Sequence, residues 1–249
     1  MTYFGRMPVS YITPEGNPAA GYLIQVRSLP NKKRKLEPLT DRLYVSPLDP
    51  ADLEKPDADL IFYHTMLRKG NSLIVTNGAQ TDMNNLRGKK VRNFDEDFSG
   101  KNPILESEAV MSDWGYEPDS MSTPRVALVR YPDISFFSIA SKNGDGGIGA
   151  IQVSVSSSGA LGLPTYTERE GQTVSLSVPG SGNIQPFMVR IPLTGNTATE
   201  IANELYEFSR PDIIVASAGA VLRNGKWEVD FRNKFNSIEE YEEFAAELK

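Results

Sequence analysis

Residues 74 to 82 read Ile74-Val75-Thr76-Asn77-Gly78-Ala79-Gln80-Thr81-Asp82, an apolar run that ends in small and polar side chains around a glycine. Such a run predicts a buried strand that leads directly into a turn rich in hydrogen-bonding groups. Loops held by a rigid scaffold commonly carry binding residues. The stretch therefore predicts a polar ligand-binding loop, although Asn-Gly on its own is most often a hairpin turn.

Two further segments complete the set that we take as a candidate ligand site. Residues 27–32 read RSLPNK, and residues 116–125 read YEPDSMSTPR. The basic run at residues 31–35 is typical of a solvated loop, but it can equally attract a phosphorylated substrate. Glu117 and Asp119, on either side of Pro118, would ordinarily be exposed loop carboxylates. Only the joint occurrence of the three segments favours a functional interpretation.

The bulk composition limits the possible partners. The chain has 249 residues, of which 39% are hydrophobic and 23% are charged, a balance typical of globular proteins. Its formal net charge of −6 argues against a broad nucleic-acid surface, because duplex binding needs many basic contacts to phosphate. A small phosphorylated ligand needs only a few local cations, so it fits this charge.

Cysteine and apolar patterning indicate the compartment. The absence of cysteine excludes disulfides, thiolate nucleophiles and cysteine metal sites, and it makes a cytoplasmic location the default expectation. The N-terminus has no signal-peptide pattern, and no apolar run approaches the roughly 18 residues that span a bilayer. We therefore expect a soluble, cytoplasmic protein without membrane partners.

The local patterns predict a mainly β protein with helices between groups of strands. The predicted strands are residues 21–26, 42–46, 60–64, 72–76, 125–131, 134–140, 148–155, 173–178, 187–192, 213–217 and 226–231. Residues 125–131 and 134–140 are expected to form a hairpin, and the glycine cluster at 143–147 another hairpin turn. No repeat or low-complexity linker divides the chain, so residues 1–249 are expected to form one domain.

Three helices are predicted. The first lies near residues 102–111. The second spans residues 198–208 and buries one face, because its apolar groups recur at a spacing of three and four. Ser237 opens the third as a capping box. Its inward residues are Tyr241, Phe244, Ala245 and Leu248.

Searches for familiar chemistry give mainly negative results. His64 is the only histidine, which makes a histidine-rich zinc site impossible. A Ser-His-Asp triad around His64 is formally possible, but no Gly-x-Ser-x-Gly elbow positions a serine nucleophile. No phosphate-binding or dinucleotide fingerprint is present. We therefore expect neither a metal nor a nucleotide cofactor.

In this order and at these spacings, a set of short motifs resembles the archaeal-type inosine monophosphate (IMP) cyclohydrolase family. The resemblance covers roughly the first half of the chain well and is thin after residue 130. The matching residues are Gly5-Arg6, Leu29-Pro30-Asn31, Phe62-Tyr63, Thr76-Asn77-Gly78, Thr81-Asp82, Tyr116-Glu117 and Asp119 with Thr123-Pro124-Arg125.

The resemblance implies an α+β fold, a four-layer α/β/β/α sandwich like that of N-terminal nucleophile hydrolases but without their N-terminal nucleophile chemistry. The implied reaction closes 5-formamidoimidazole-4-carboxamide ribonucleotide (FAICAR) to IMP and water, the last step of purine synthesis, without a metal or redox cofactor. Assembly into a homo-oligomer is also implied. Two alternatives stay open: a purine-ribonucleotide-binding protein without catalysis, and an amide hydrolase that acts on a C–N bond of another small substrate.

The resemblance also implies roles for individual residues. Tyr63 is expected to donate its phenolic proton to the formyl oxygen, and Glu117 to take a proton from the carboxamide or to orient it. The expected substrate-binding residues are Arg27, Asn31, Lys32, Asn77, Gly78, Thr81, Asp82 and Arg125. Each has an ordinary structural explanation as well; Tyr63, for example, fits a core aromatic with a satisfied hydroxyl.

Lys32 departs from the family pattern, which places a substrate-binding arginine at this position. Lysine keeps the positive charge but loses the planar pair of donors, so the contact becomes a point charge suited to phosphate. This departure and the divergent second half of the chain keep the non-catalytic alternative open.

Overall fold

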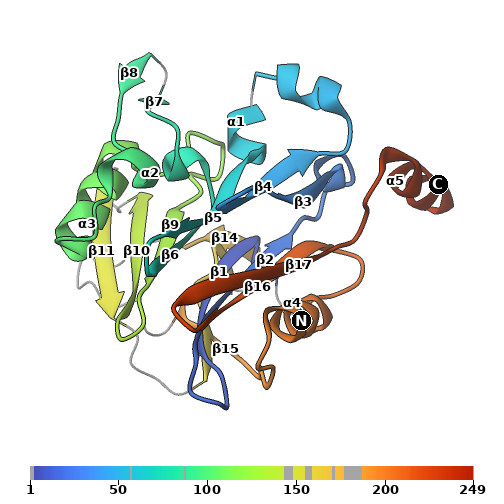
Figure 1. Cartoon of the computed structure of the whole chain (residues 1–249). Coiled ribbons are helices and arrows are strands. Elements are labelled where there is room, and N and C mark those ends of the chain that lie inside the picture. Colours follow the sequence, from blue (N-terminus) through green and yellow to red (C-terminus); the bar gives the residue numbers. More distant parts are fainter. Residues whose placement is uncertain are drawn as a thin grey trace.

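The computed structural model describes residues 3–56, 58–86, 88–142, 148–154, 159–169, 172–176 and 187–248, with 148–154, 168 and 169 described by their backbone alone. Two antiparallel sheets form its centre (Figure 1). The first sheet has the order β15 (Val189–Ile191), β12 (Ala160–Gly162), β1 (Arg6–Ile12), β2 (Pro18–Gln25), β16 (Ile214–Arg223) and β17 (Lys226–Asn233). The second has the order β11 (Ile148–Ser154), β10 (Ser135–Lys142), β9 (Arg125–Arg130), β6 (Ser72–Thr76), β5 (Tyr63–Lys69), β4 (Arg42–Pro47) and β3 (Arg34–Pro38).

The remaining elements connect and flank these sheets. The α-helices are α1 (Ala58–Ile61), α2 (Phe94–Asp97), α3 (Pro103–Trp114), α4 (Ala198–Phe208) and α5 (Ile238–Glu247). Two small ribbons pair β7 (Asn85–Leu86) with β8 (Lys89–Lys90) and β13 (Tyr166–Arg169) with β14 (Gln172–Ser175). Short 3-10 turns lie at Pro30–Lys32, Pro50–Glu54 and Ala79–Thr81. In the described part of the chain, no helix has the length and apolar character to cross a membrane.

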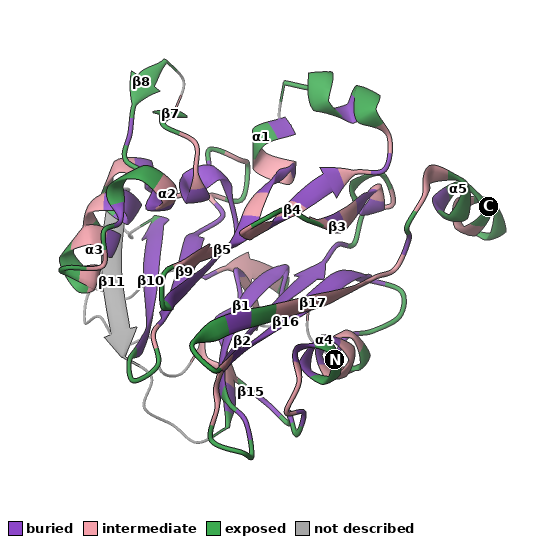
Figure 2. Cartoon of the chain, in the orientation of Figure 1, coloured by how far each residue is buried: buried purple, intermediate pink, exposed green. Residues whose placement is uncertain are grey.

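The central core lies between the two sheets. Tyr22 and Ile24 of β2 pack with Val45, Val75 and Leu128 of the second sheet, and all five side chains are fully buried. Burial of an apolar side chain of this size contributes roughly 1.5–3 kcal/mol. The inner faces of the sheets therefore hold each other in place, as the buried strands in Figure 2 show.

Helices cover the outer faces. On the first sheet, Ile201 and Leu205 of α4 pack with Met7 and Leu23. On the second sheet, residues of α3 pack against β6, β9 and β10. The buried α3 residues in this cluster are Val110, Met111 and Trp114. The chain is thus a mixed α+β protein, in which two facing antiparallel sheets lie between helices.

Many of the predicted elements are confirmed. β6 and α4 agree with the predicted ranges 72–76 and 198–208, and β9 pairs with β10 as the expected hairpin. Strands β1 and β3 were not predicted. The predicted turn at 143–147 lies outside the described residues.

The predicted strand at residues 60–64 is wrong in its first part. Leu60 and Ile61 close helix α1, in which the N–H of Phe62 donates to the carbonyl oxygen of Ala58 at 2.7 Å, and β5 begins only at Tyr63. A short apolar run fits a helix turn and a strand equally well, so periodicity cannot separate them.

Helix α5 matches the prediction with two corrections. Ser237 caps it by accepting from the N–H of Glu240 at 3.4 Å, but the Glu240 carboxylate accepts from Asn236 rather than completing the capping box. Tyr241 is buried, whereas Leu248 is 61% exposed and not inward. The helix ends at Glu247, so Leu248 follows its last turn and lies beyond the residues of α5 that pack in the cluster around Phe235.

The packing of α4 on the first sheet can be tested at two glycines that face each other in register, Gly219 of β16 and Gly21 of β2. A Cβ on Gly219 would lie 2.2 Å from the backbone oxygen of Ala198, whereas one on Gly21 would meet the tip of the Leu205 side chain at 2.4 Å. Because helix backbone cannot move as freely as a side chain tip, we expect Gly219→Ala to lower the free energy of unfolding by about 1–3 kcal/mol and Gly21→Ala to lower it less. Urea denaturation of both variants checks this; an equal or larger loss for Gly21→Ala would contradict it.

Candidate functional site

A cavity of about 400 Å³ opens where β1 begins and β2 ends. Its wall comes from residues within 3–6, 25–34, 60–61 and 117–119, together with Tyr166. Concave sites with a few convergent polar groups are the usual place for small ligands. Two of the three segments selected from the sequence, 27–32 and 116–125, contribute directly to this wall.

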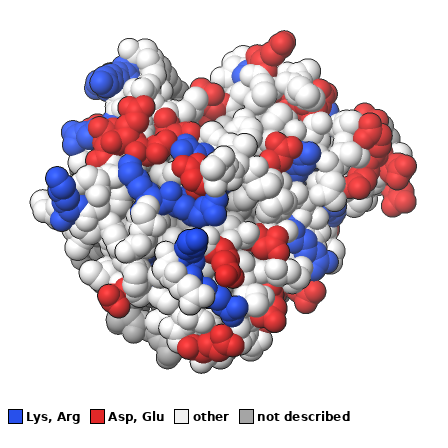
Figure 3. Space-filling view, in the orientation of Figure 1, with Lys and Arg blue, Asp and Glu red and all other residues white. Residues whose placement is uncertain are grey.

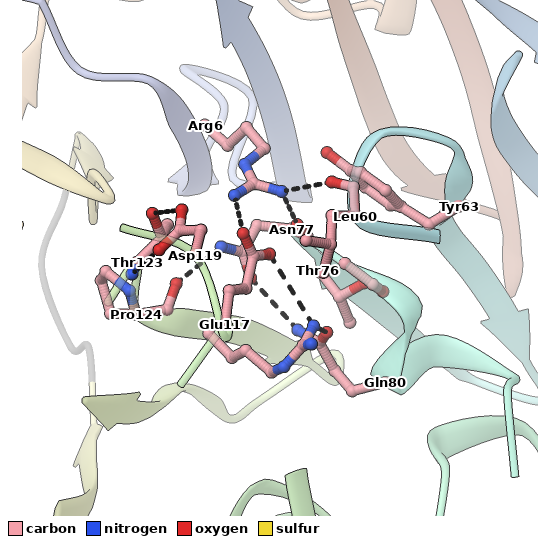
Figure 4. A network of polar contacts seen from close by, with 12 residues as sticks. Arg6, Leu60, Tyr63, Thr76, Asn77, Gln80, Glu117, Asp119, Thr123 and Pro124 are labelled. Atoms are coloured by element: carbon pink, nitrogen blue, oxygen red, sulfur yellow. Dashed lines mark hydrogen bonds and ion pairs between the residues drawn. The ribbon is translucent and has the colours of Figure 1, made fainter. Parts of the chain in front are cut away.

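A buried ion pair lies at the centre of the wall. Nη2 of Arg6, the first residue of β1, is 2.5 Å from Oε2 of Glu117 in the loop after α3. Nη1 of Arg6 donates to the carbonyl oxygens of Asn77 at 2.7 Å and Leu60 at 3.3 Å (Figure 4). Burial acts against the charge of Arg6, but Glu117 and nearby phenols raise the pKa of Arg6 well above its ordinary value. The guanidinium therefore stays charged and links three loops.

The second carboxylate oxygen of Glu117 has a charged neighbour but no hydrogen-bond donor among the described residues. Oε1 is buried and has no hydrogen-bond partner in the described part of the chain. Nη1 of Arg125 lies 3.7 Å from it but donates to Oε1 of Gln80 at 2.9 Å, and the guanidinium stacks 4.7 Å from the Trp114 ring. A buried acceptor without a donor costs about 1–3 kcal/mol. Oε1 thus remains an acceptor without a donor in the described structure, and it faces Arg125 and Gly78.

Two phenols share a hydrogen bond behind Arg6. The hydroxyls of Tyr22 and Tyr63 are 2.8 Å apart, and both side chains are buried. The guanidinium carbon of Arg6 lies 5.8 Å from the centre of the Tyr63 ring. Burial, reinforced by the Tyr63 phenol, raises the pKa of Tyr22 well above its ordinary value. Tyr22 therefore stays protonated, and when it donates to Tyr63 the proton of Tyr63 is free to point elsewhere.

The Asn77 turn holds the floor of the site. The side-chain amide of Asn77 donates to the carbonyl oxygen of Pro124 at 2.8 Å, and its Oδ1 accepts from the N–H of Val126 at 2.7 Å and from Gln80 at 3.1 Å. These bonds fix the start of β9 against the end of β6. Both ends of the amide are hydrogen-bonded within the protein, and the backbone carbonyl oxygen of Asn77 accepts from Arg6, which lines the cavity. Substrate contact by its side chain stays a prediction.

The loop that carries Glu117 is itself held closed. The carboxylate of Asp119 accepts from the N–H and hydroxyl of Thr123 at 2.8 and 2.5 Å. The Thr123 hydroxyl also lies 2.7 Å from that of Tyr166. Gly5 packs against the Tyr166 ring with φ +69°, where an added Cβ would lie 2.3 Å from the ring, so only glycine fits there.

The structure brings some predicted site residues to the cavity and places others behind it. Arg27, Asn31 and Glu117 line the cavity. Gly78 and Arg125 lie behind Glu117, where a Cβ on Gly78 would be 2.6 Å from Nη1 of Arg125. Close approach of the Arg125 side chain explains this glycine.

Lys32 faces a different, larger cavity of about 1,040 Å³, which shares Tyr3 and Arg27 with the first. Its Nζ donates to the carbonyl oxygen of Asp212 at 2.5 Å, and its side chain is 5% exposed. The run that is typical of a solvated basic loop is therefore partly buried, because Lys32 and Arg34 both point inward.

Thr81 and Asp82 bond to neighbouring strands. The Thr81 hydroxyl donates to the carbonyl oxygen of His64 at 2.5 Å. Asp82 pairs with Nδ1 of His64 and lies 3.5 Å from Nη1 of Arg42. His64 is thus engaged by an acid of the scaffold, and substrate contact by Thr81 and Asp82 stays a prediction.

Arg6, Tyr22, Gln25 and Arg34 were not among the selected site residues. Gln25 accepts from the N–H of Phe4 at 2.7 Å and donates to Ser209 at 2.8 Å, so it fixes the N-terminal wall. Arg6 belongs to one of the motifs noted in the sequence. The feature that could have identified it as a site residue is its position as a charged residue at the start of a mainly apolar strand. Among the described residues, no group of three or more His, Cys, Asp or Glu side chains could hold a metal ion.

Comparisons with known proteins identify the family of this chain. The IMP cyclohydrolase of Methanococcus maripaludis (strain C7) is 28% identical over 225 residues, 90% of this chain and 96% of the relative. That of Methanocella arvoryzae is 25% identical over 234 residues, 93% of this chain and 98% of the relative. The family model described as IMP cyclohydrolase-like protein matches residues 3–226. Because this match covers most of the sequence, the chain belongs to the IMP cyclohydrolase-like family.

Proposed function

We propose that the protein is an IMP cyclohydrolase that closes FAICAR to IMP and water in the cavity around Arg6 and Glu117. The relatives that match over most of the chain carry this name. The observation that carries the proposal is the buried Glu117 carboxylate in the cavity wall: Arg6 holds one of its oxygens, and the other has no hydrogen-bond donor among the described residues.

The reaction needs orientation more than activation. The carboxamide nitrogen, a weak nucleophile, forms a bond to the formyl carbon of the same molecule. The carboxamide nitrogen and the formamido nitrogen each lose one proton, and the formyl oxygen leaves with the equivalent of both as water, so that the acid that protonates it is restored. Holding the two groups in contact geometry lowers the barrier by several kcal/mol. Oε1 of Glu117 accepts a hydrogen bond from the carboxamide nitrogen and fixes its direction, while Arg6 holds the carboxylate through Oε2. The structure thus favours an orienting role for Glu117.

The phenol pair suits the second requirement. As the formyl carbon becomes tetrahedral, its oxygen gains charge and must be protonated before it can leave. In the proposal Tyr63 donates this proton and Tyr22 donates to the Tyr63 oxygen as it gains charge. Arg6 lies next to the ring and adds a positive charge there. The formyl end of the substrate enters beside Arg6 and Leu60, which border the cavity.

Further features of the proposal rest on the family resemblance. They are a single-domain fold like that of N-terminal nucleophile hydrolases, a reaction without metal or other cofactor, a cytoplasmic location and a homo-oligomeric state. The proposal includes a ribonucleotide substrate but no nucleic-acid or membrane partner. On the face in Figure 3, acidic side chains gather over α5, and basic atoms elsewhere are interspersed with acidic ones.

The activity can be measured directly. Addition of FAICAR is expected to give an increase in IMP absorbance that is proportional to protein concentration. Tight binding of the unformylated carboxamide ribonucleotide without turnover would favour the non-catalytic alternative. If the protein neither turns over FAICAR nor binds the unformylated ribonucleotide, the proposal is contradicted.

The role of Tyr63 can be tested with Tyr63→Phe. We expect kcat to fall by about 10²-fold or more, since general acid catalysis contributes roughly 10²–10⁴-fold, while KM changes little. Tyr11→Phe is the matched control, because Tyr11 is also buried and its hydroxyl has no partner among the described residues, but it lies in the core under α4. Equal losses in kcat and in substrate affinity for Tyr63→Phe would instead make Tyr63 a binding residue.

Glu117 needs a test that separates chemistry from folding, because Glu117→Gln leaves Arg6 buried without its partner. Loss of one member of a buried ion pair costs about 3–5 kcal/mol, whereas replacing both by apolar residues is often neutral. We expect Glu117→Gln to lower both stability and kcat. The double variant Arg6→Met/Glu117→Met should regain most of the stability, measured by urea denaturation, and remain inactive. Recovery of activity in the double variant would show that the pair serves the fold alone.

A further inference from the structure

Arg34 is a buried cation without an acidic partner. It opens β3, lines the cavity and is 7% exposed. Nη1 donates to the carbonyl oxygen of Ile61 at 3.3 Å, and Nε has no hydrogen-bond partner in the part of the chain that the structure describes. None of the ion pairs among those residues includes Arg34, whereas Arg6 is paired with Glu117. A buried charge in this state is costly unless an opposite charge reaches it.

The surroundings of Arg34 add positive rather than negative charge. Burial and the repulsion of Arg6 lower the pKa of Arg34, partly offset by the nearby phenols. The charges of Arg34, Arg6 and Arg27 all act on the Tyr3 phenol, whose pKa burial nevertheless raises. The three guanidinium groups therefore share one small volume around Tyr3, and this volume attracts anions.

The other two arginines have partners already. Arg6 holds Glu117 and two carbonyl oxygens. Arg27 is exposed, stacks 4.6 Å from the Tyr3 ring and donates to the Thr173 hydroxyl at 3.0 Å. Lys32 is turned into the neighbouring cavity and bonds to a backbone oxygen. Of the basic residues that line the cavity, Arg34 alone combines burial, a place in the cavity wall and the lack of an acidic partner among the described residues.

We propose that Arg34, rather than Lys32, is the anion anchor of this cavity and binds the phosphate group of a sugar phosphate or nucleotide, assisted by Arg27. A guanidinium offers phosphate two parallel donors, which an ammonium cannot. Phosphate binding places a negative charge among the three guanidinium groups around Tyr3. That the phosphate belongs to FAICAR rests on the proposed function; anion binding by Arg34 does not.

Thermal unfolding of the full chain with ribose 5-phosphate, and with ribose at equal ionic strength, tests this proposal. A ligand that binds only the folded state raises Tm. We expect ribose 5-phosphate to raise the Tm of the wild type and ribose to have no effect. In Arg34→Met the apparent Kd should weaken by about tenfold or more, since hydrogen bonds between charged groups are roughly twice as strong as those between neutral groups. Arg34→Lys should lie between the two.

Lys35→Met is the matched control. Lys35 lies on the same strand but does not line the cavity, and its Nζ is 2.9 Å from Oε1 of Glu37. The variant therefore removes one positive charge and should keep the wild-type response. Equal stabilisation of the wild type and Arg34→Met would overturn the proposal, as would a larger loss from Lys32→Met than from Arg34→Met. If Arg34→Met does not fold, a wild-type Kd in Arg34→Lys overturns the two-donor contact. Phosphate binding without FAICAR turnover would contradict the proposed function but would still support anion binding by Arg34.

Discussion

The ion pair between Arg6 and Glu117 is the contact on which the site depends. Arg6 belongs to the first sheet, whereas Glu117 follows α3 on the side of the second, so the pair ties the two halves together at the cavity. The same guanidinium binds the carbonyl oxygens of Asn77 and Leu60 and thereby sets the ends of β6 and α1. One oxygen of Glu117 is used in this way, and the other has no hydrogen-bond donor among the described residues.

Several charged side chains are buried around the cavity, and the proposed function explains why. Buried ion pairs are weak sources of stability compared with apolar packing, so a network of arginines is better explained by ligand binding than by folding. Arg6 forms an ion pair with the Glu117 carboxylate, and Arg125 lies 3.7 Å from its other oxygen. Arg34 has no ion-pair partner among the described residues. The resulting field favours an anionic substrate although the whole chain carries a net charge of −6.

Sequence patterns were sufficient where one physical rule dominates. The three-and-four spacing of α4 and the apolar run of β6 predicted these elements correctly, since each buries a single continuous face. Leu60 was assigned to a strand but lies in α1, because a short apolar run fits both a helix turn and a strand. The ordered motifs identified the family, which the family model confirms. The direction of individual side chains could not be predicted from the sequence. Lys32 and Arg34 are only two residues apart, and the position at which β3 starts determines which of them lines the cavity.

The central claim is that the cavity around Arg6 and Glu117 is the ribonucleotide site. A crystal structure of the protein with IMP tests it most directly. We predict the purine base against Oε1 of Glu117 and the phosphate on the guanidinium of Arg34. IMP bound instead in the larger cavity, with its phosphate at Lys32, would contradict the account.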